Sequence, residues 1–471
     1  MKALFEGDDD VVFTAIAAGA GGGVRLTAAF VDGLADREQI NISVLKPLLR
    51  YGSLRHCRSA AALFKSVAAG AAHHCSYEIH YKMNDALEAL LSGQALIVFD
   101  ALGAAISFDV RNYDKRGITE PTNESVLKGS KESFIESIAV NMALVRHRLQ
   151  TENLKIERFR LGERMNTSVA VVYIEGIADP DVVGAVRKRI NDIKTRGVVS
   201  AGQIETALSG DKRTLFPQIL YTERTDKFCG NIVDGRVGVL TDGLPVAYIT
   251  PVDFNSLIQA PEDYAFNSLI SSVFRLLRYT CVFAALILPS FYVAVTSFHQ
   301  EMIPTPLVIS IIASKQGVPF PTYVEVLFML LAFEVLLEAG LRLPQAIGQA
   351  VSIVGALVVG QAAIAAHMMS PGVVIIISAA GITGFVVPSQ ELSNTIRFGR
   401  IILVLLSAIG GLFTVTLGLI WALYHMCTLE IFGTAYLSPF VSREGKGMFR
   451  DTIIRLSWRR KATRSGSGDQ R

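Results

Sequence analysis

The chain has 471 residues, of which 51% are hydrophobic and 18% charged, and its formal net charge is +3. The charged fraction is below the roughly 25% of an ordinary soluble domain, and most charged residues precede Arg278 or follow Ser442. The small net charge gives no basis for nucleic-acid binding, and the 5 cysteines are scattered without a CxxC pair, which argues against a disulfide framework and a zinc site.

Residues 1–278 have the pattern of a soluble α/β region, within which two pairs of sequence words repeat. VDGLAD at 31–36 closes an apolar run and precedes a helical pattern, as IEGIAD does at 174–179. ALIVF before Asp100 matches RVGVL before Asp242, and both pairs lie about 142–143 residues apart. A strand-ending glycine followed by an aspartate favours a tight turn that leads into a helix N-cap. We therefore expect two copies of one α/β subdomain, over residues 1–120 and 161–278.

Residues 121–160 connect the two copies. Asn123, Glu124 and Ser125 form a polar turn, and from Lys131 to Val145 apolar residues recur at roughly helical spacing. We expect an amphipathic connecting helix here. Two arrangements are consistent with this pattern: the helix packs on its own subdomain, or it packs on a neighbouring subunit.

The soluble region shows no constellation of catalytic residues. The glycine-rich stretch at 19–23 lacks both the GxGxxG spacing and the lysine of a P-loop, so we interpret it as a hairpin tip. We interpret Glu223, Arg224 and Asp226 as a small structural ion-pair network. We predict that the chain is not an enzyme and that it holds no cofactor and no metal ion. The acidic residues before the apolar run at 11–18 do not suit a signal peptide, so we expect a cytoplasmic N-terminal region.

The stretch at 289–321 marks the change from soluble to membrane sequence. It contains two proline pairs, and the apolar residues between them, 302–313, are too few to cross a hydrocarbon core of about 30 Å. A proline-broken apolar piece at membrane depth must be covered by protein or border a watery cavity. We therefore expect a re-entrant segment within a transmembrane domain over residues 279–441.

Four segments of this domain are predicted membrane spans because they contain no Asp, Glu, Lys or Arg: 279–298, 347–369, 372–389 and 401–427. A fifth, 323–341, is apolar but holds Glu325, Glu334 and Glu338. Acidic side chains inside a bilayer face protein or water. Arg275 and Arg278 precede the first span, which favours an outward direction for it.

These segments predict conflicting positions for the C-terminus. Five spans that begin inside would place it outside. Residues 442–471, however, form a basic tail with nine Lys or Arg against three acidic residues, which favours the inside. The conflict disappears if 302–313 or 428–441 adds a partial crossing, or if the Glu-bearing helix lies in the interface.

Several polar and small residues of the membrane half are candidates for a cation pathway. Glu301 follows the first span, where a ring of carboxylates would raise the local cation concentration. Small residues in 347–369 let helices approach closely or, around an axis of several copies, leave a narrow pore. The candidate pathway residues are Glu301, Glu334, Gln349, Ser352, Ile353, Gly355 and Gln361.

Words spread over nearly the whole chain resemble the A-subunit family of bacterial spore germinant receptors, which includes a related stage V sporulation protein. They include PTNESVLKG at 121–129, VVYIEGIADP at 171–180, FPQILYTERTD at 216–226 and PSFYVAVTSFHQEMIPTPL at 289–307. GVPFP at 317–321, the stretch at 338–363 and YLSPF at 436–440 follow in order. One departure is Thr225, where members of the family usually have proline.

The resemblance implies a channel-forming subunit of a nutrient-sensing complex in the inner membrane of the spore. It implies a homo-oligomeric ring that passes monovalent cations, a permease-like B subunit that binds the nutrient, and a lipoprotein C subunit. The alternatives are a companion channel that amplifies ion release, a secondary transporter, and a non-conducting scaffold for the partners. The predicted fold is therefore a duplicated α/β soluble region followed by an all-α polytopic membrane domain.

Overall fold

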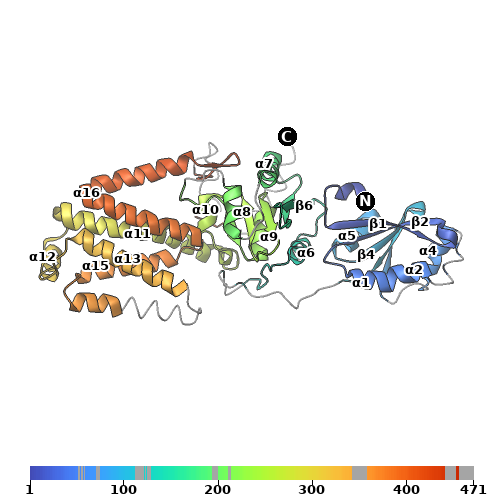
Figure 1. Ribbon diagram of the computed structural model, residues 1–471, viewed down its shortest axis with the longest axis horizontal. Helices are drawn as coiled ribbons and strands as arrows, with labels where there is room; N and C mark the ends of the chain where they lie inside the picture. Colours follow the sequence, from blue (N-terminus) through green and yellow to red (C-terminus); the bar gives the residue numbers. More distant parts are fainter. Residues whose placement is uncertain are drawn as a thin grey trace. The chain divides into compact units, whose positions relative to one another are not determined.

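The computed structural model describes residues 1–50, 54, 57, 59–70, 75–111, 121, 124, 129–193, 200–209, 214–341, 358–440 and 452–455. The chain divides into two units, of which the first is α/β and the second helical (Figure 1). Unit 1 comprises Met1–Lys212, Gln218–Val252 and Ile431–Gly433, and unit 2 comprises Arg213–Pro217, Asp253–Glu430 and Thr434–Arg471. This architecture confirms the predicted fold class.

Unit 1 contains two antiparallel sheets with matching strand orders, β1-β2-β4-β5-β3 and β6-β7-β9-β10-β8. Val11 pairs with Val31 in the first sheet, and Leu154 pairs with Ile174 in the second. The two sheets therefore share one register as well as one topology, as expected for a duplicated subdomain. The strands of the first sheet are β1 (Val11–Ala18), β2 (Val24–Val31), β3 (Tyr77–His80), β4 (Ala95–Phe99) and β5 (Ala104–Phe108). Those of the second are β6 (Leu154–Leu161), β7 (Thr167–Ile174), β8 (Leu220–Thr222), β9 (Val237–Thr241) and β10 (Ala247–Thr250).

Helices cover these sheets because apolar strand residues need partners on both faces. In the first copy they are the single turn η1 (Lys2–Phe5), α1 (Arg37–Gln39), η3 (Ile40–Leu45), α2 (Lys46–Arg50), α4 (Ala60–Ala68) and α5 (Met83–Leu91). In the second copy they are α6 (Ile138–Arg148), α7 (Pro180–Asn191), α8 (Ala201–Leu208) and α9 (Thr225–Val233).

The repeated glycine–aspartate words form the turns that the sequence predicts. Gly33 and Gly176 adopt positive φ angles of 86° and 83°, which favour glycine because it has no Cβ. The carboxylate of Asp36 accepts hydrogen bonds from the backbone N–H groups of residues 38 and 39, and Asp179 accepts one from residue 181. Each aspartate thus caps the helix that follows the strand.

The connecting helix is shorter than the sequence pattern predicts. α6 begins at Ile138, because the residues before it are extended: the backbone N–H of Phe134 donates to the carbonyl of Glu223 at 2.7 Å. α6 packs on β7, β9 and α9 of the second copy, and Ala139 and Ala143 also lie against Gly33 of the first. Within this chain the helix therefore packs on its own subdomains, the first of the two expected arrangements.

Of the predicted polar turn the structure describes Glu124, which contacts the second copy. Its carboxylate accepts hydrogen bonds from the Thr222 hydroxyl and the Glu223 backbone N–H, and lies 2.6 Å from Lys227 Nζ. The buried Arg224 binds Asp226 with two hydrogen bonds of 3.0 and 2.6 Å. The predicted network of charges thus has a structural role in holding the connection to the second copy.

Unit 2 is a bundle of helices (Figure 1). Its helices are α10 (Phe254–Ile258), η5 (Pro261–Tyr264), α11 (Ser268–Phe298), η6 (Gln300–Met302), α12 (Thr305–Ser314), α13 (Thr322–Leu341), α15 (Pro371–Phe385) and α16 (Gln390–Thr428). Residues 358–365 are also helical, and β11 (Glu430–Ile431) forms a short hairpin with β12 (Thr434–Ala435). Over the described residues, α11 and α16 are the two helices long and apolar enough to cross a membrane. α12, in the expected re-entrant segment, has no buried residue.

Candidate functional site

The long helix α16 reverses direction within the predicted span 401–427. Gly410 and Gly411 have non-helical backbone angles, and Gly411 has a φ of 62°. The Thr414 hydroxyl donates to the Leu406 carbonyl at 2.5 Å, and a Cβ built on Gly418 would lie 2.7 Å from Leu406 Cδ1. α16 is therefore a helical hairpin with arms over residues 390–409 and 412–428, not one straight span.

The two ends of this hairpin reach the same segment of unit 2. The Thr395 hydroxyl, on the first arm, donates to the Leu215 carbonyl at 2.6 Å. His425 Nε2, on the second arm, lies 2.9 Å from the Thr214 hydroxyl. Trp421 stacks on His425 and is 69% exposed, a position typical of aromatic residues at a membrane interface.

A buried carboxylate lies at the start of α13. The Glu325 side chain is 0% exposed, and its Oε1 lies 3.2 Å from Lys315 Nζ. Its Oε2 accepts a hydrogen bond of 2.8 Å from the backbone N–H of Ser370, which caps α15. Lys315 Nζ also donates to the Thr322 hydroxyl. The acid and the cation together hold the α12–α13 connection against the start of α15.

Sequence reasoning missed this pair, although a signal for it existed. Lys315 is the sole lysine or arginine between Arg278 and Arg342. A glutamate buried in this region must be paired or lose its charge, so Lys315 was the available cation nearby in the sequence.

A second carboxylate, Glu334, is shared by two arginines of α16. Arg397 binds it with two hydrogen bonds, of which the one from Nε measures 3.0 Å, and Arg400 lies 3.7 Å away. The Arg400 side chain is 3% exposed. Glu334, a candidate pathway residue, is therefore engaged in an ion-pair cluster.

The two arginines at the start of α11 are also paired and buried. Arg278 binds the Asp263 carboxylate at 2.7 and 2.8 Å, and Arg275 Nε donates to it at 3.0 Å. The sequence placed these arginines as flanking cations. In the structure one carboxylate offsets part of their charge and fixes the turn that leads into α11.

The other candidate pathway residues divide into two groups. Glu301, in η6 after α11, and Gln361, in the helical stretch 358–365, have exposed side chains. The structure does not bring Glu301 and Glu334 together, since Glu301 follows the end of α11 whereas Glu334 contacts the first arm of α16. The candidates that lie outside the described residues are Gln349, Ser352, Ile353 and Gly355.

Small residues do permit close helix packing next to Gln361. A Cβ built on Gly360 would lie 3.1 Å from Val374 Cγ1 on α15. Gly360 is buried, whereas the neighbouring Gln361 is exposed. Gly360 thus faces the bundle, whereas the adjacent Gln361 side chain is exposed.

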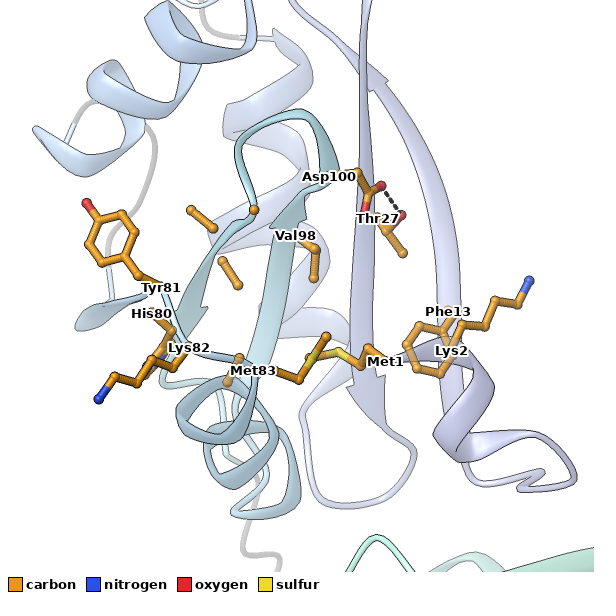
Figure 2. A pocket seen from close by; sticks show the side chains of 14 residues that line it. Met1, Lys2, Phe13, Thr27, His80, Tyr81, Lys82, Met83, Val98 and Asp100 are labelled. Carbon is orange, nitrogen blue, oxygen red and sulfur yellow. Dashed lines mark hydrogen bonds between the residues drawn. The ribbon is translucent and has the colours of Figure 1, made fainter.

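Unit 1 has a groove of about 520 Å³ on one face of the first sheet (Figure 2). Its floor includes Phe13, Thr27 and Val98, from β1, β2 and β4. The exposed Asp100 accepts a hydrogen bond of 3.2 Å from the Thr27 hydroxyl at one end. Apart from the repeated word that ends in Asp100, nothing in the sequence indicated this groove.

A buried ion cluster joins the two copies of unit 1. Arg146, on α6, binds Asp10 at 2.8 Å and lies 3.5 Å from Asp8, and all three side chains are at most 1% exposed. Lys155 Nζ lies 3.4 Å from Asp8. Burial raises the pKa of the Asp8 carboxyl, and the nearby Arg146 opposes that rise.

Over the described residues no group of three or more histidine, cysteine, aspartate or glutamate side chains is arranged to hold a metal ion.

Sequence comparison relates the chain to known proteins. The family model described as "Bacillus/Clostridium GerA spore germination protein" matches residues 1–467. The chain is 37% identical to the uncharacterized membrane protein YfkQ of Bacillus subtilis, covering 98% of this chain and 89% of that protein. It is 35% identical to spore germination protein KA of the same organism, covering 95% and 82%.

A further match is a solved structure, the N-terminal domain of the A subunit of the Bacillus megaterium spore germinant receptor GerK3. The two chains are 24% identical, with a TM-score of 0.40, and the match covers 54% of this chain and 92% of the chain in the solved structure. Because the family model and the relatives each cover most of the sequence, the chain belongs to the GerA family of spore germination proteins.

Proposed function

We propose that this chain is the A-type membrane subunit of a spore germinant receptor and that several copies surround a passage for monovalent cations. The relatives are spore germination proteins, which supports the receptor role. The observation that supports the proposed ion passage is the exposed Gln361 beside the buried Gly360. A free amide facing hydrocarbon is costly, so the face that carries Gln361 needs water or a neighbouring copy.

The proposed topology follows from the hairpin. At 1.5 Å per residue, the arms over 390–409 and 412–428 are about 30 and 25 Å long, each close to the thickness of the hydrocarbon core. If α16 crosses out and back, the crossing count becomes even and both ends of unit 2 lie on the cytoplasmic side. The basic tail over 442–471 then obeys the positive-inside rule.

The proposed partners are a permease-like B subunit, a lipoprotein C subunit and further copies of this chain in the spore inner membrane. Glu301 lies at the end of α11 that faces outward in this topology. A ring of such exposed carboxylates would concentrate cations at the mouth of the passage. Glu334 has a different role, because its two arginines keep it from acting as a cation site.

Reconstitution tests the proposal. Potassium-loaded vesicles that contain the full chain with its B- and C-type partners should leak potassium when the nutrient is added. Gln361→Leu should reduce this leak, whereas Val359→Leu, at an exposed apolar neighbour, should not. Vesicles that stay ion-tight would exclude the channel and favour a scaffold, and saturable uptake coupled to a second ion would favour a transporter.

A further inference from the structure

The internal repeat allows the groove to be compared with the matching face of the second sheet. The groove-floor residues and their counterparts at the repeat spacing are Phe13 and Ile156, Thr27 and Ala170, and Val98 and Leu240. The strand register supports this match, since Thr27 lies opposite Val98 just as Ala170 lies opposite Leu240. The three second-sheet side chains are 0% exposed, whereas the three groove residues are half-buried.

This difference in exposure between the two sheets arises from one helix, α6. In the second copy α6 packs across β7 and β9, and its Met142 and Val145 are 0% exposed. In the first copy the described residues that precede β1 include one short turn, η1, which covers part of this face through Phe5. The groove thus occupies the position that α6 fills in the second copy.

The turn that receives α6 is also repeated. Asp242 follows β9, and its Oδ1 accepts a hydrogen bond of 3.1 Å from the backbone N–H of Ile138, the first residue of α6. The N-cap residue, Ser137, makes no such bond with its own side chain. Asp100 is the counterpart of Asp242, and its carboxylate is exposed at the end of the groove. It is therefore placed to accept from the first N–H groups of a helix.

The charges around the groove suit one direction of such a helix. Asp100 lies at one end, and Lys2 and Lys82 flank the other end (Figure 2). A helix carries partial positive charge at its N-terminus and partial negative charge at its C-terminus. A helix with its N-terminus at Asp100 would therefore present its C-terminal carbonyls, and any acidic residues of its last turn, to the two lysines.

We propose that this groove binds an amphipathic helix of another polypeptide, with the helix N-terminus at Asp100 and an acidic last turn at Lys2 and Lys82. The helices described in unit 1 already pack their apolar faces on the two sheets. Among the described helices of unit 1, a second copy of the chain could therefore supply a helix of this kind only by unfolding part of its own core. The proposal does not depend on ion conduction by unit 2.

Cysteine labelling tests whether the groove is covered in the assembled receptor. Val98→Cys in the full chain is labelled with a maleimide, and labelling at that residue is quantified by mass spectrometry. We expect at least about tenfold slower labelling in membranes that contain the whole receptor than in the purified chain. Thr14→Cys is the matched control, because Thr14 is an exposed residue of β1 whose side chain points to the other face of the sheet.

Two results of the labelling experiment would contradict the proposal. Equal labelling of Val98→Cys in both preparations would overturn it, because an occupied groove protects its floor. Protection that persists when this chain is expressed without other receptor subunits would assign the groove to a second copy and overturn the choice of a different polypeptide.

A pair of synthetic peptides tests the direction of the helix. The first carries residues 135–149 of this chain, and the second carries the same residues with R146E and R148E, which makes the last turn acidic. Purified full-length chain should bind the acidic peptide several-fold more tightly, and Lys82→Glu should reverse this preference. Asp100→Ala should weaken binding about fivefold through loss of the cap. Val98→Glu should abolish binding and Thr14→Glu should preserve it. Equal binding of both peptides, or of either to Val98→Glu, would contradict the proposed direction and seat.

Discussion

The Thr414 hydroxyl donates a hydrogen bond of 2.5 Å to the carbonyl of Leu406, a residue that precedes it by 8 positions. In a continuous helix residues at that separation are about 12 Å apart along the axis. The bond therefore requires the chain to turn back between them. This reversal makes the second arm, residues 412–428, run back along the first, residues 390–409.

Sidedness of labelling should follow this reversal. Cys427 is exposed near the end of the second arm, and a cysteine introduced by Glu301→Cys lies after α11. A membrane-impermeant maleimide should label the two positions from opposite sides of oriented vesicles. Labelling of both from the same side would mean that α16 crosses the membrane an odd number of times.

The turn itself should not tolerate a side chain. A Cβ on Gly411 would lie 2.9 Å from both His299 Cε1 and Phe298 Cβ, and its φ of 62° is strained for other residues. Gly411→Ala should cost about 1–3 kcal/mol and lower the thermal unfolding midpoint in detergent. Gly384→Ala is the control, because nothing lies within 4 Å of a Cβ there. Equal midpoints for the two variants would show that the turn relaxes.

Substitutions at Lys315 and Glu325 should have strongly coupled effects on the free energy of unfolding. Lys315→Met leaves the Glu325 carboxylate buried with the Ser370 N–H as its remaining polar contact in the described residues, and should cost about 3–5 kcal/mol. Glu325→Gln keeps the side-chain shape and should cost about 1–3 kcal/mol. The double variant should be more stable than the sum of the two losses predicts, as measured by SDS titration in mixed micelles. Additive losses would mean that the pair contributes no interaction energy.

The stability of the contact between the two copies of unit 1 should depend on Arg146. Arg146→Met leaves Asp8 and Asp10 buried, so urea unfolding of unit 1 should lose about 3–5 kcal/mol. Arg187→Met is the matched control, since Arg187 also binds a carboxylate, that of Glu157, but is 41% exposed. It should cost at most about 1 kcal/mol. Similar losses in the two variants would contradict a special role for the buried cluster.

Thiol labelling should depend on pH in a residue-specific way. Burial raises the pKa of the Cys229 thiol to about 12. A raised pKa means fewer thiolates at a given pH, about one in ten thousand at pH 8, and the thiolate is the reactive form. The rate of iodoacetamide labelling at Cys229, followed by mass spectrometry, should therefore rise about tenfold for each pH unit between 8 and 10. A rate that reaches a plateau below pH 10 would show that the thiol is not held in this buried state.

The fold of unit 1 followed from the sequence because its signals are local. Apolar runs, strand-ending glycines and capping aspartates such as Asp36 and Asp179 act over a few residues, and their repetition predicted the two copies. The start of α6 did not follow, because the residues before Ile138 pair with Glu223, far away in the chain.

The sequence by itself determined that carboxylates occur in an apolar half and that its last span contains Gly410, Gly411 and Gly418. It did not determine the structural role of these carboxylates and glycines. A glycine pair in an apolar helix, for example, is compatible with close packing and with a turn. The tertiary structure alone placed Lys315 beside Glu325, two arginines beside Glu334, and Thr414 beside Leu406. It also showed that, over the described residues, no counterpart of α6 covers the first sheet. Which side chains pair with one another, and which sheet face a helix covers, depends on the segments that meet in space. Local patterns of polarity carry no information about those contacts.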